Sequence, residues 1–473
     1  MTLKLFNTMT KKKEIFKPLK NEEVKLFVCG ITAYNYSHLG HARTYAFYDT
    51  LVRFLRYLDY NVVYLQNVTD VGHLFDTGED KILKKAKEER KDPMEIAQYY
   101  LDHWLEMMDR LRMQKPDLMP RATEHIKEII DQIQAIIKNG YAYVSNGSVY
   151  FDIGKFKDYG KLSKKIPKEL SAGIRVEVNP EKKDAKDFAL WIKAPASHTL
   201  KWKAPFSLGY PGWHIEDTAI AVKHFGPQYD IHGGAIELAF PHHEAEIAQA
   251  ESSTGVKPYV KYWVHTGLLT INKQKMAKSI GNVVKISDAL EEFSPETLRF
   301  WIASTHYRKP LDYNKRDLEV AKKKVERTST TLERINESYK KAGTKNFVVN
   351  KVNKLKKEFL DAMNDDINTP LALTKYFEII TLVNRQIDKK QFSKNDLKLA
   401  EETIKELGNL FQIITPTKKK ELSKESLELI KKREVARKLG DFARADEIRN
   451  ELKEKFEIIL EDTKEGVKWK FVD

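Results

Sequence analysis

The first 70 residues carry three successive patterns of apolar positions. Leu26-Phe27-Val28-Cys29 is an apolar run that ends at Gly30, as expected for a buried strand of a parallel sheet. Residues 62–65 form a second apolar run. Between them, apolar residues recur at the spacing of one helix face, at Phe47, Leu51, Phe54, Leu55 and Leu58. A strand, a helix and a strand predict a right-handed crossover in a parallel sheet, with ligands bound at the carboxyl ends of the strands, where Cys29 falls.

The pattern after residue 70 predicts more helix than strand. The expected elements are helices over residues 80–140, a polar irregular insertion over 154–195, strands and loops over 213–240, helices from 294 onward, and polar linkers at 340–345 and 415–426. Thr369-Pro370 predicts an N-cap followed by proline in the first turn of a helix. The chain is therefore predicted to be α/β: a Rossmann-like parallel-sheet domain with an inserted segment, then an α-helical bundle and a small C-terminal α+β domain.

Composition adds a basic surplus to this picture. The 473 residues include 82 Lys and Arg against 68 Asp and Glu, for a formal net charge of +14. Such a surplus favours a polyanionic partner, although lysines scattered over many helices would give the same value. A single cysteine excludes an intrachain disulfide framework, and there is no apolar run long enough to span a bilayer. We therefore expect a soluble, cytoplasmic protein.

His38-Leu39-Gly40-His41 lies between the first predicted strand and the helix that follows it. A helix N-terminus offers free backbone N–H groups and the positive end of the helix dipole, so it attracts phosphate. Gly40 allows close approach of a nucleotide, and the two imidazoles can hydrogen-bond to a phosphate chain as charge builds up on it. Because so short a motif also recurs by chance, it leaves a structural role open.

Lys275-Met276-Ala277-Lys278-Ser279 follows a strand-like run at residues 268–271. Two lysines and a serine beside a triphosphate would neutralise a departing pyrophosphate, although ordinary solvated lysines give the same pattern. Chance alone produces this motif and the histidine motif together, in this order, much more rarely than it produces either motif by itself. The pair indicates nucleotide binding.

His242 and Glu246 lie four residues apart at the start of a predicted helix, so both side chains are on one face, at a spacing suited to shared metal ligation. Cys29, at its strand end, is expected to reach the same cleft. Two other interpretations stay open here. A lone cysteine is commonly a small buried hydrophobe, and a His/Glu pair on a helix is commonly a surface hydrogen bond.

Four longer runs resemble the cysteinyl-tRNA synthetase family of class I aminoacyl-tRNA synthetases. They are Phe27-Val28-Cys29-Gly30-Ile31-Thr32, Gly209-Tyr210-Pro211-Gly212-Trp213-His214-Ile215-Glu216, Asp230-Ile231-His232-Gly233-Gly234 and Phe240-Pro241-His242-His243-Glu244. The two short motifs are similar to the HIGH and KMSKS signatures of that class, with Leu39 and Ala277 as departures, and Tyr210 stands where the family commonly has Arg. Tail residues 441–446 and 460–463 also match, so the resemblance covers nearly the whole chain.

The resemblance implies one active-site zinc ion per chain, which binds the thiolate of the substrate cysteine. The family's zinc ligands carry over to Cys29, Asp217, His242 and Glu246. Asp217 is a departure because cysteine is common at that position, but aspartate also ligates zinc through oxygen. The harder ligand set is expected to weaken zinc retention. Zinc would also separate cysteine from serine, because it binds a thiolate strongly and a neutral hydroxyl weakly.

The resemblance further implies an ATP-dependent cysteine–tRNA ligase that acts as a monomer on L-cysteine, ATP with Mg²⁺, and tRNA(Cys). The residues it implies are His38, His41, Lys275 and Lys278 for catalysis, Gly40, Lys278 and Ser279 for ATP, and Gly30, Thr69, Trp213 and Glu237 for the amino acid. Glu237 stands where the family commonly has Asp. For Trp213, simple packing stays open as an alternative.

The same resemblance assigns roles to segments of the chain. They are the two halves of the catalytic domain at 1–118 and 209–268, a connective insertion at 119–208, a stem-contact region with the KMAKS loop at 269–322, the helical bundle at 323–415, and a small anticodon-binding domain at 416–473.

Three rival functions are weighed against this one. A ligase that passes activated cysteine to an amino-sugar amine would share the catalytic half, but it has no use for a helical bundle and a basic tail. A non-catalytic RNA-binding paralogue is disfavoured because both signature motifs keep their histidines and lysines. A zinc hydrolase that uses His243 and Glu244 would need a further histidine at helical spacing, and residues 245–253 contain none.

Overall fold

The structure is a computed structural model that describes residues 2–73, 80–164, 179–196, 198–276, 281–344, 346, 348–416, 423–456, 458–463 and 466–471. The chain divides into two compact units, Met1–Ile414 and Thr415–Asp473. Among the described residues, no helix is both long enough and apolar enough to cross a membrane.

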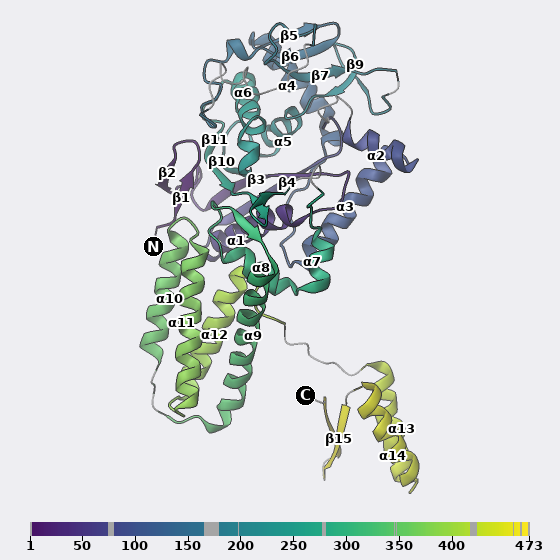
Figure 1. The fold of residues 1–473 in the computed structure, drawn as a ribbon, viewed down its shortest axis with the longest axis vertical. Helices are drawn as coiled ribbons and strands as arrows, with labels where there is room; N and C mark the ends of the chain where they lie inside the picture. The colour runs from purple at the N-terminus through teal and green to yellow at the C-terminus, as the bar shows by residue number, and fades with distance from the viewer. Residues whose placement is uncertain are drawn as a thin grey trace. The chain divides into compact units, whose positions relative to one another are not determined.

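The first unit is built on a four-stranded sheet in which every neighbouring pair of strands is parallel (Figure 1). Its order is β11-β10-β3-β4, formed by β3 (Glu23–Thr32), β4 (Asn61–Thr69), β10 (Tyr229–Ala235) and β11 (Val260–Thr266). Helix α1 (Leu39–Tyr57) connects β3 to β4, which confirms the predicted β–α–β unit. The strand order reverses between β3 and β10, the place where open α/β sheets bind their ligands.

The two faces of β3 pack against different helices because successive side chains of a strand point to opposite sides. Leu26 and Val28 belong to the core that contains α1. Phe27 and Cys29 belong to a second core, which includes residues of α4 (Ile126–Lys138), α5 (Ile215–Phe225) and α6 (His242–Thr254). Cys29 therefore lies on the side of the sheet that faces α5 and α6.

The insertion contains an antiparallel sheet that the sequence pattern did not predict. Its order is β5-β6-β7-β9-β8, with β5 (Ala142–Ser145), β6 (Ser148–Phe151), β7 (Phe188–Lys193), β8 (Trp202–Lys203) and β9 (Leu208–Pro211). The prediction of an irregular stretch was wrong for β7, whose two buried residues, Leu190 and Trp191, are adjacent instead of alternating. This sheet includes residues on both sides of the boundary predicted at 208/209, and residues 165–178 of the same stretch lie outside the described residues.

The predicted helices on both sides of the insertion are confirmed. They are α2 (Lys81–Glu89), α3 (Pro93–Arg110) and α4 before it, and α8 (Pro295–Ala303), α9 (Lys315–Ser338), α10 (Val349–Asn364), α11 (Thr369–Asp388) and α12 (Lys394–Phe411) after it. Helix α7 (Ile286–Glu292) lies before residue 294 and was not predicted. Helices α9 to α12 form the bundle (Figure 1). The N-cap of α11 is Asn368, not Thr369 as predicted, because the Asn368 side chain accepts a hydrogen bond from the Leu371 amide at 3.3 Å.

Short strands complete the first unit. β1 (Lys4–Asn7) pairs with β2 (Lys12–Ile15), and β12 (Leu269–Ile271) lies between β13 (Gln274–Lys275) and β14 (Leu311–Tyr313).

The second unit has the α+β composition predicted for the tail. It contains α13 (Lys424–Lys438), α14 (Phe442–Phe456), β15 (Ile458–Thr463) and β16 (Gly466–Phe471). Ile448 and Leu452 of α14 pack with Ile458 and Leu460 of β15 in a small core of their own.

Candidate active site

Four buried donor groups meet on the α5–α6 side of the sheet. Cys29 ends the apolar run of β3, Asp217 lies in the first turn of α5, and His242 and Glu246 lie on one face of α6. His242 Nε2 is 2.9 Å from both Asp217 Oδ2 and Glu246 Oε1, and Cys29 Sγ is 3.5 Å from His242 Nε2. One donor atom from each of the four lies within 4.8 Å of all the others, so they are placed to hold one metal ion.

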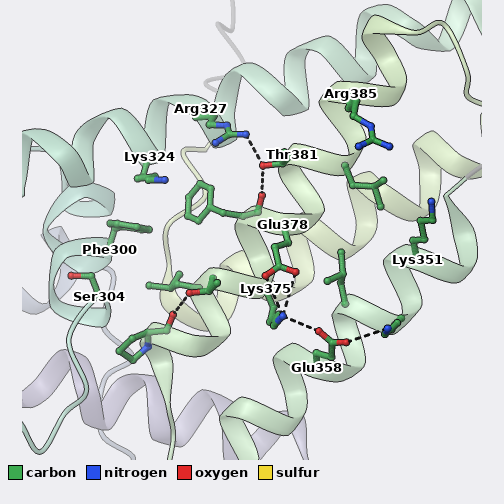
Figure 2. Close-up of a pocket in the computed structure, with 17 residues that line it drawn as sticks. Phe300, Ser304, Lys324, Arg327, Lys351, Glu358, Lys375, Glu378, Thr381 and Arg385 are labelled. Atoms are coloured by element: carbon green, nitrogen blue, oxygen red, sulfur yellow. Dashed lines mark hydrogen bonds and ion pairs between the residues drawn. The ribbon is translucent and has the colours of Figure 1, made fainter.

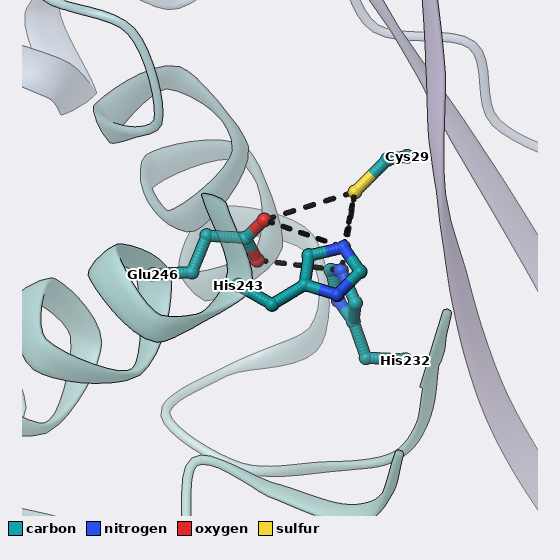
Figure 3. Close-up of side chains that lie close together, drawn as sticks. All are labelled: Cys29, His232, His243 and Glu246. Atoms are coloured by element: carbon teal, nitrogen blue, oxygen red, sulfur yellow. Dashed lines mark hydrogen bonds and ion pairs between the residues drawn. The ribbon is translucent and has the colours of Figure 1, made fainter. Parts of the chain in front are cut away.

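A second set of donors overlaps this cluster (Figure 3). It consists of Cys29, His232 on β10, His243 on α6, and Glu246. Cys29 Sγ lies 3.2 Å from the Nε2 atoms of both His232 and His243, and Glu246 Oε2 lies 3.3 Å from His232 Nε2. Because both sets use Cys29 and Glu246, they describe one site for a single ion and not two sites.

Burial and the two carboxylates determine the protonation of the cluster. Burial by itself lowers the pKa of His242, but Glu246 and Asp217 outweigh that effect and raise this pKa to about 10. Burial raises the pKa of the Cys29 thiol well above its ordinary value and that of Glu246 to about 7. Burial also keeps the pKa of His232 well below its ordinary value, so this imidazole is neutral. A metal ion must therefore displace protons from Cys29 and His242.

Neighbouring groups fix the orientation of the donors. The Asn67 side-chain amide donates to Asp217 Oδ1, and Nδ1 of His242 lies 2.5 Å from Nδ1 of His214. The indole of Trp213 stacks on the His242 ring, with 5.1 Å between centroids. Metal ligands are commonly held in this way by a second layer of hydrogen bonds. One sulfur, one imidazole nitrogen and two carboxylate oxygens, all buried and oriented, fit a four-coordinate divalent metal ion.

His214 occupies a backbone conformation that favours glycine, with φ at 89°. Such a conformation costs about 1–3 kcal/mol and persists only where the surroundings hold it. Here the residue is the N-cap of α5 and its imidazole reaches His242. The strained residue therefore lies beside the cluster of candidate metal ligands. Only Ile215 and Glu216 separate it from Asp217 in the first turn of α5.

A cavity of about 470 Å³ opens beside the cluster at the carboxyl ends of β3 and β10. Its lining includes six residues predicted from the sequence: Cys29, Gly30, His38, Gly40, His41 and Glu237. Two predicted pocket residues do not line it. Thr69 is buried, and its hydroxyl accepts a hydrogen bond from Asn67, while Trp213 is stacked between His73 and His242.

The histidine motif begins α1 at the rim of this cavity. His38 is the N-cap, its backbone N–H donates to Nδ1 of His41 at 3.2 Å, and the two rings stack with centroids 3.8 Å apart. A Cβ atom on Gly40 would lie 3.1 Å from Cε of Met276, so the two signature segments are in contact. Lys275 ends β13, and Lys278 and Ser279 lie outside the described residues.

Gly30 has a steric reason to be glycine. A Cβ atom there would lie 1.5 Å from the carbonyl oxygen of Asn67, at an irregularity in the β3–β4 pairing. Its N–H donates to Asn67 Oδ1 at 2.7 Å. The Asn67 side chain thus accepts a hydrogen bond from the backbone of β3 and donates one to Asp217.

Sequence reasoning missed two polar residues in the cavity. Lys81 Nζ lies 2.6 Å from Nε2 of His73, and His73 Nδ1 lies 2.5 Å from the hydroxyl of Thr32. Asp80 caps α2 and thereby puts Lys81 in the first turn of that helix, facing the cavity. In the sequence, the only indication for Lys81 was its position directly after Asp80, a typical N-cap residue. That position does not distinguish Lys81 from the many other basic residues of the chain.

Known proteins resemble this chain in sequence and in fold. Residues 15–323 match the family model described as tRNA synthetases class I (C) catalytic domain, and residues 358–415 match the DALR domain. The structure is similar to that of Mycobacterium tuberculosis methionyl-tRNA synthetase in complex with methionyl-adenylate, with a TM-score of 0.62 at 14% identity over 86% of this chain and 94% of that chain. A putative arginyl-tRNA synthetase from Campylobacter jejuni gives a TM-score of 0.55 at 16% identity, over 84% of this chain and 94% of that one.

The fold and the catalytic-domain match define the chain as a class I tRNA synthetase. Curated relatives narrow the assignment. The cysteine–tRNA ligases of Chlorobium chlorochromatii and Thermococcus onnurineus are each 42% identical to this chain, over 99% of this chain and 99% of their own length. The chain belongs to the cysteine–tRNA ligase family.

Proposed function

We propose that this chain activates L-cysteine with ATP and transfers it to the 3′ end of tRNA(Cys). One observation carries the proposal: Cys29 belongs to the buried cluster with Asp217, His242 and Glu246, and it lines the same cavity as the His38–His41 segment. A metal ion held by the cluster would supply recognition of a thiol, and the helix N-terminus would supply a site for phosphate. The relatives, which match over nearly their full length, carry the name of this activity.

The chemistry proceeds in two displacements. The carboxylate of cysteine attacks the α-phosphate of ATP, the bond to pyrophosphate breaks, and cysteinyl-adenylate forms. His38 and His41 would hydrogen-bond to the phosphates, and Lys275 and Lys278, with Mg²⁺, would stabilise the departing pyrophosphate. A terminal ribose hydroxyl of tRNA then attacks the acyl carbon, and AMP leaves. The chain contributes positioning and charge, not a covalent nucleophile.

Cys29, Asp217, His242 and Glu246 are the residues we assign to a zinc ion. When bound, zinc would supply a strong attraction for a thiolate and a weak one for a neutral hydroxyl. This difference would let the site reject serine, which an apolar pocket separates from cysteine by only about 1–3 kcal/mol. Gly30, Thr69, Trp213 and Glu237 are assigned to the amino acid, with Thr69 and Trp213 behind the cavity wall.

The decisive experiment is ATP–pyrophosphate exchange with cysteine and with serine, before and after chelation, with metal content measured on the same samples. We expect exchange with cysteine, at most about a thousandth of that rate with serine, and loss of both exchange and metal after chelation. Full activity in metal-free protein would contradict the zinc assignment and leave the ligase standing. Exchange that does not depend on cysteine would contradict the proposed function.

Cys29→Ala and His242→Ala test the cluster itself. Each removes a ligand, so we expect cysteine-dependent exchange to fall by about a hundredfold or more and zinc content to fall with it. Val222→Ala, on α5 but away from the donors, is the matched control for a general loss of packing. Near-normal exchange in either ligand variant would remove the thiol-recognition role.

The remaining assignments concern the roles of the other domains, the compartment and the oligomeric state. We propose that residues 416–473 bind the anticodon, that residues 119–208 are a connective insertion, and that the protein acts as a cytoplasmic monomer. The small separate core of the second unit supports a dedicated binding domain, and the single cysteine suits a reducing compartment.

A further inference from the structure

A small cavity of about 20 Å³ lies where α1, the end of β11, α8 and the start of α11 meet. Its polar lining includes Arg43 and Thr50 of α1, Thr266 of β11, Arg299 of α8 and Thr369, the first residue of α11. Among the described residues, this cavity shares no lining residue with the active-site cavity. It is therefore a separate interior space of the first unit.

One face of α1 forms the first wall of this cavity. Arg43, Ala46, Phe47 and Thr50 recur at intervals of three and four residues, so they lie on the same side of the helix. The Phe47 ring stacks on the ring of Tyr307, with 4.1 Å between centroids, and both rings line the cavity. This face of α1 thus buries a guanidinium group between apolar side chains.

Helix α8 contributes the second guanidinium group. Arg299 and Ile302, three residues apart on one side of this helix, both line the cavity. Phe300 lies on another side of α8, where its ring meets that of Phe377 at 5.7 Å between centroids, in the groove shown in Figure 2. Arg299 is therefore directed into the interior and not toward that groove.

Arg43 is a buried cation that neutral groups hold in place. It is 3% exposed, and its Nη2 donates to the backbone carbonyls of Tyr307, at 3.2 Å, and of Lys309. Burial lowers the pKa of Arg43 to about 9, and no carboxylate of the described residues offsets that effect. The guanidinium is still charged at pH 7, so a full positive charge lies in the interior without a counter-charge, which is costly.

Arg299 has a carboxylate partner, but it shares that partner. Asp49 bonds to Nη2 of Arg299 at 2.5 Å and to Nε of Arg53 at 2.9 Å. Three buried nitrogens of the two cavity arginines, Nε and Nη1 of Arg43 and Nη1 of Arg299, have no hydrogen-bond partner among the described residues. Buried donors without a partner are rare in folded proteins, and a bound ion or water is a common reason for them. Two cations thus have spare N–H groups at one cavity.

Size and charge together select the occupant of this cavity. A volume of about 20 Å³ holds little more than one water molecule, which needs about 10–15 Å³, so a phosphate is too large. Water would accept the spare hydrogen bonds but leave the charge of Arg43 without a counter-charge. The start of α11 at Thr369 adds the positive end of a helix dipole, and the described lining contains no carboxylate. These features favour a small anion over water.

We propose that this cavity binds one chloride ion between the guanidinium groups of Arg43 and Arg299. The ion would neutralise Arg43, accept the spare N–H groups of both arginines, and join α1 to α8 and to the first turn of α11. It would be a structural anion at the place where the helix that follows β3 meets the helical bundle. The inference concerns the stability of the first unit and does not rest on the proposed function.

The test joins a direct observation to a matched pair of variants. Crystals of the full chain soaked in bromide, which replaces chloride and scatters anomalously, show whether a halide lies between Arg43 and Arg299. Urea unfolding is measured with chloride raised from about 10 to about 300 mM, while gluconate, an anion too large for the cavity, keeps the ionic strength constant. Arg43→Gln removes the unpaired charge of the cavity. Arg56→Gln removes a charge from the same helix, but Arg56 does not line the cavity and its side chain is 35% exposed.

We expect an anomalous peak in the cavity. Once chloride exceeds its Kd, the equilibrium constant for unfolding should fall about tenfold for each tenfold rise in chloride, because one ion binds the folded chain. Arg56→Gln should keep this dependence and Arg43→Gln should lose it. A cavity without a peak, or equal chloride dependence in the two variants, would overturn the inference and leave water as the partner of the guanidinium groups. If Arg43→Gln does not fold, a missing peak or less than about a twofold change per tenfold chloride in the unsubstituted chain would overturn it.

Discussion

Asp217 is the residue at which the predicted metal site has oxygen in place of a second sulfur. Its Oδ2 lies 2.9 Å from His242 Nε2, and its other oxygen accepts from Asn67. We predict that Asp217→Cys increases zinc retention by about tenfold or more, because a second thiolate is a softer and stronger ligand for zinc. Competition with a chromophoric chelator measures the affinity without relying on activity.

Asn67→Ala is the counterpart of that change. It leaves all four donors in place and removes the hydrogen bond that orients Asp217, so zinc affinity should fall by about 10–100-fold. Equal zinc affinity in the original chain, Asp217→Cys and Asn67→Ala would mean that Asp217 is not a ligand. The alternative set, with His232 and His243, would then hold the ion.

A site residue could be predicted from the sequence where local spacing places it, and could not where only contacts between distant segments do. His242 and Glu246 could be paired from helical spacing, and Cys29 from its place at a strand end. His232 and His243 could not be assigned, because β10 joins β3 only through a pairing between segments about 200 residues apart. His243 also follows His242 directly, and no helical spacing rule groups neighbours on one face.

A buried ion pair links three helices of the first unit. Asp49 on α1 and Arg299 on α8 are both at most 2% exposed and lie 2.5 Å apart, and Arg299 Nε donates to the carbonyl of Phe411 at the end of α12 at 2.8 Å. We predict that Asp49→Asn lowers the free energy of unfolding by about 3–5 kcal/mol, because it leaves the guanidinium buried without its charge partner. The midpoint of urea unfolding at pH 7 measures the loss.

The same pair gives a pH dependence with a defined sign. Burial by itself raises the pKa of Asp49, but Arg299 and Arg53 outweigh it and hold this pKa below the ordinary value. A folded-state pKa below the unfolded value of about 3.9 stabilises the fold above that pH, and the stabilisation is lost as pH falls through the folded-state pKa. The difference between Asp49→Asn and the original chain should therefore narrow on acidification below about pH 4.

Arg53→Gln is the control for this pair. Its side chain is 21% exposed, so loss of its bond to Asp49 should cost no more than about 1 kcal/mol. Equal losses in the two variants would mean that the Asp49–Arg299 pair has no special part in joining α1 to α8 and α12.

Elements were predictable where one pattern persisted over the whole element. The β3–α1–β4 unit and the bundle helices have long periodic apolar stripes, so their type followed from spacing. The insertion sheet consists of strands of two to six residues whose partners lie up to about 40 residues away. Such strands are too short, and their buried residues alternate too little, to be recognised in the sequence. Strand β7 forms because it pairs with β6 on one edge and with β9 on the other.

The whole molecule divides where packing stops, close to residue 415. Ile413 is 1% exposed in the core of the first unit, and the carbonyl of Ile414 accepts from Arg112 Nη1 at 3.0 Å. Among its described residues, the second unit keeps its own core, in which Ile448 and Leu452 of α14 pack with Ile458 and Leu460 of β15. A chain that ends after Pro416 therefore removes no residue from the first core.

We predict that such a chain, residues 1–416, keeps cysteine-dependent pyrophosphate exchange within about twofold. Its kcat/KM for aminoacylation of tRNA should fall by about tenfold or more, because the proposed anticodon-binding surface of the second unit is removed and only the surface of the first unit is left to bind tRNA. A chain that ends after Leu407 is the control, because it also removes Leu410 and Phe411 from the first core and should unfold at lower urea. Undiminished aminoacylation by residues 1–416 would contradict an anticodon-binding role for the tail. Loss of exchange as well would show that the two units do not work independently, since activation needs only the cavity beside Cys29 and the segment at His38–His41.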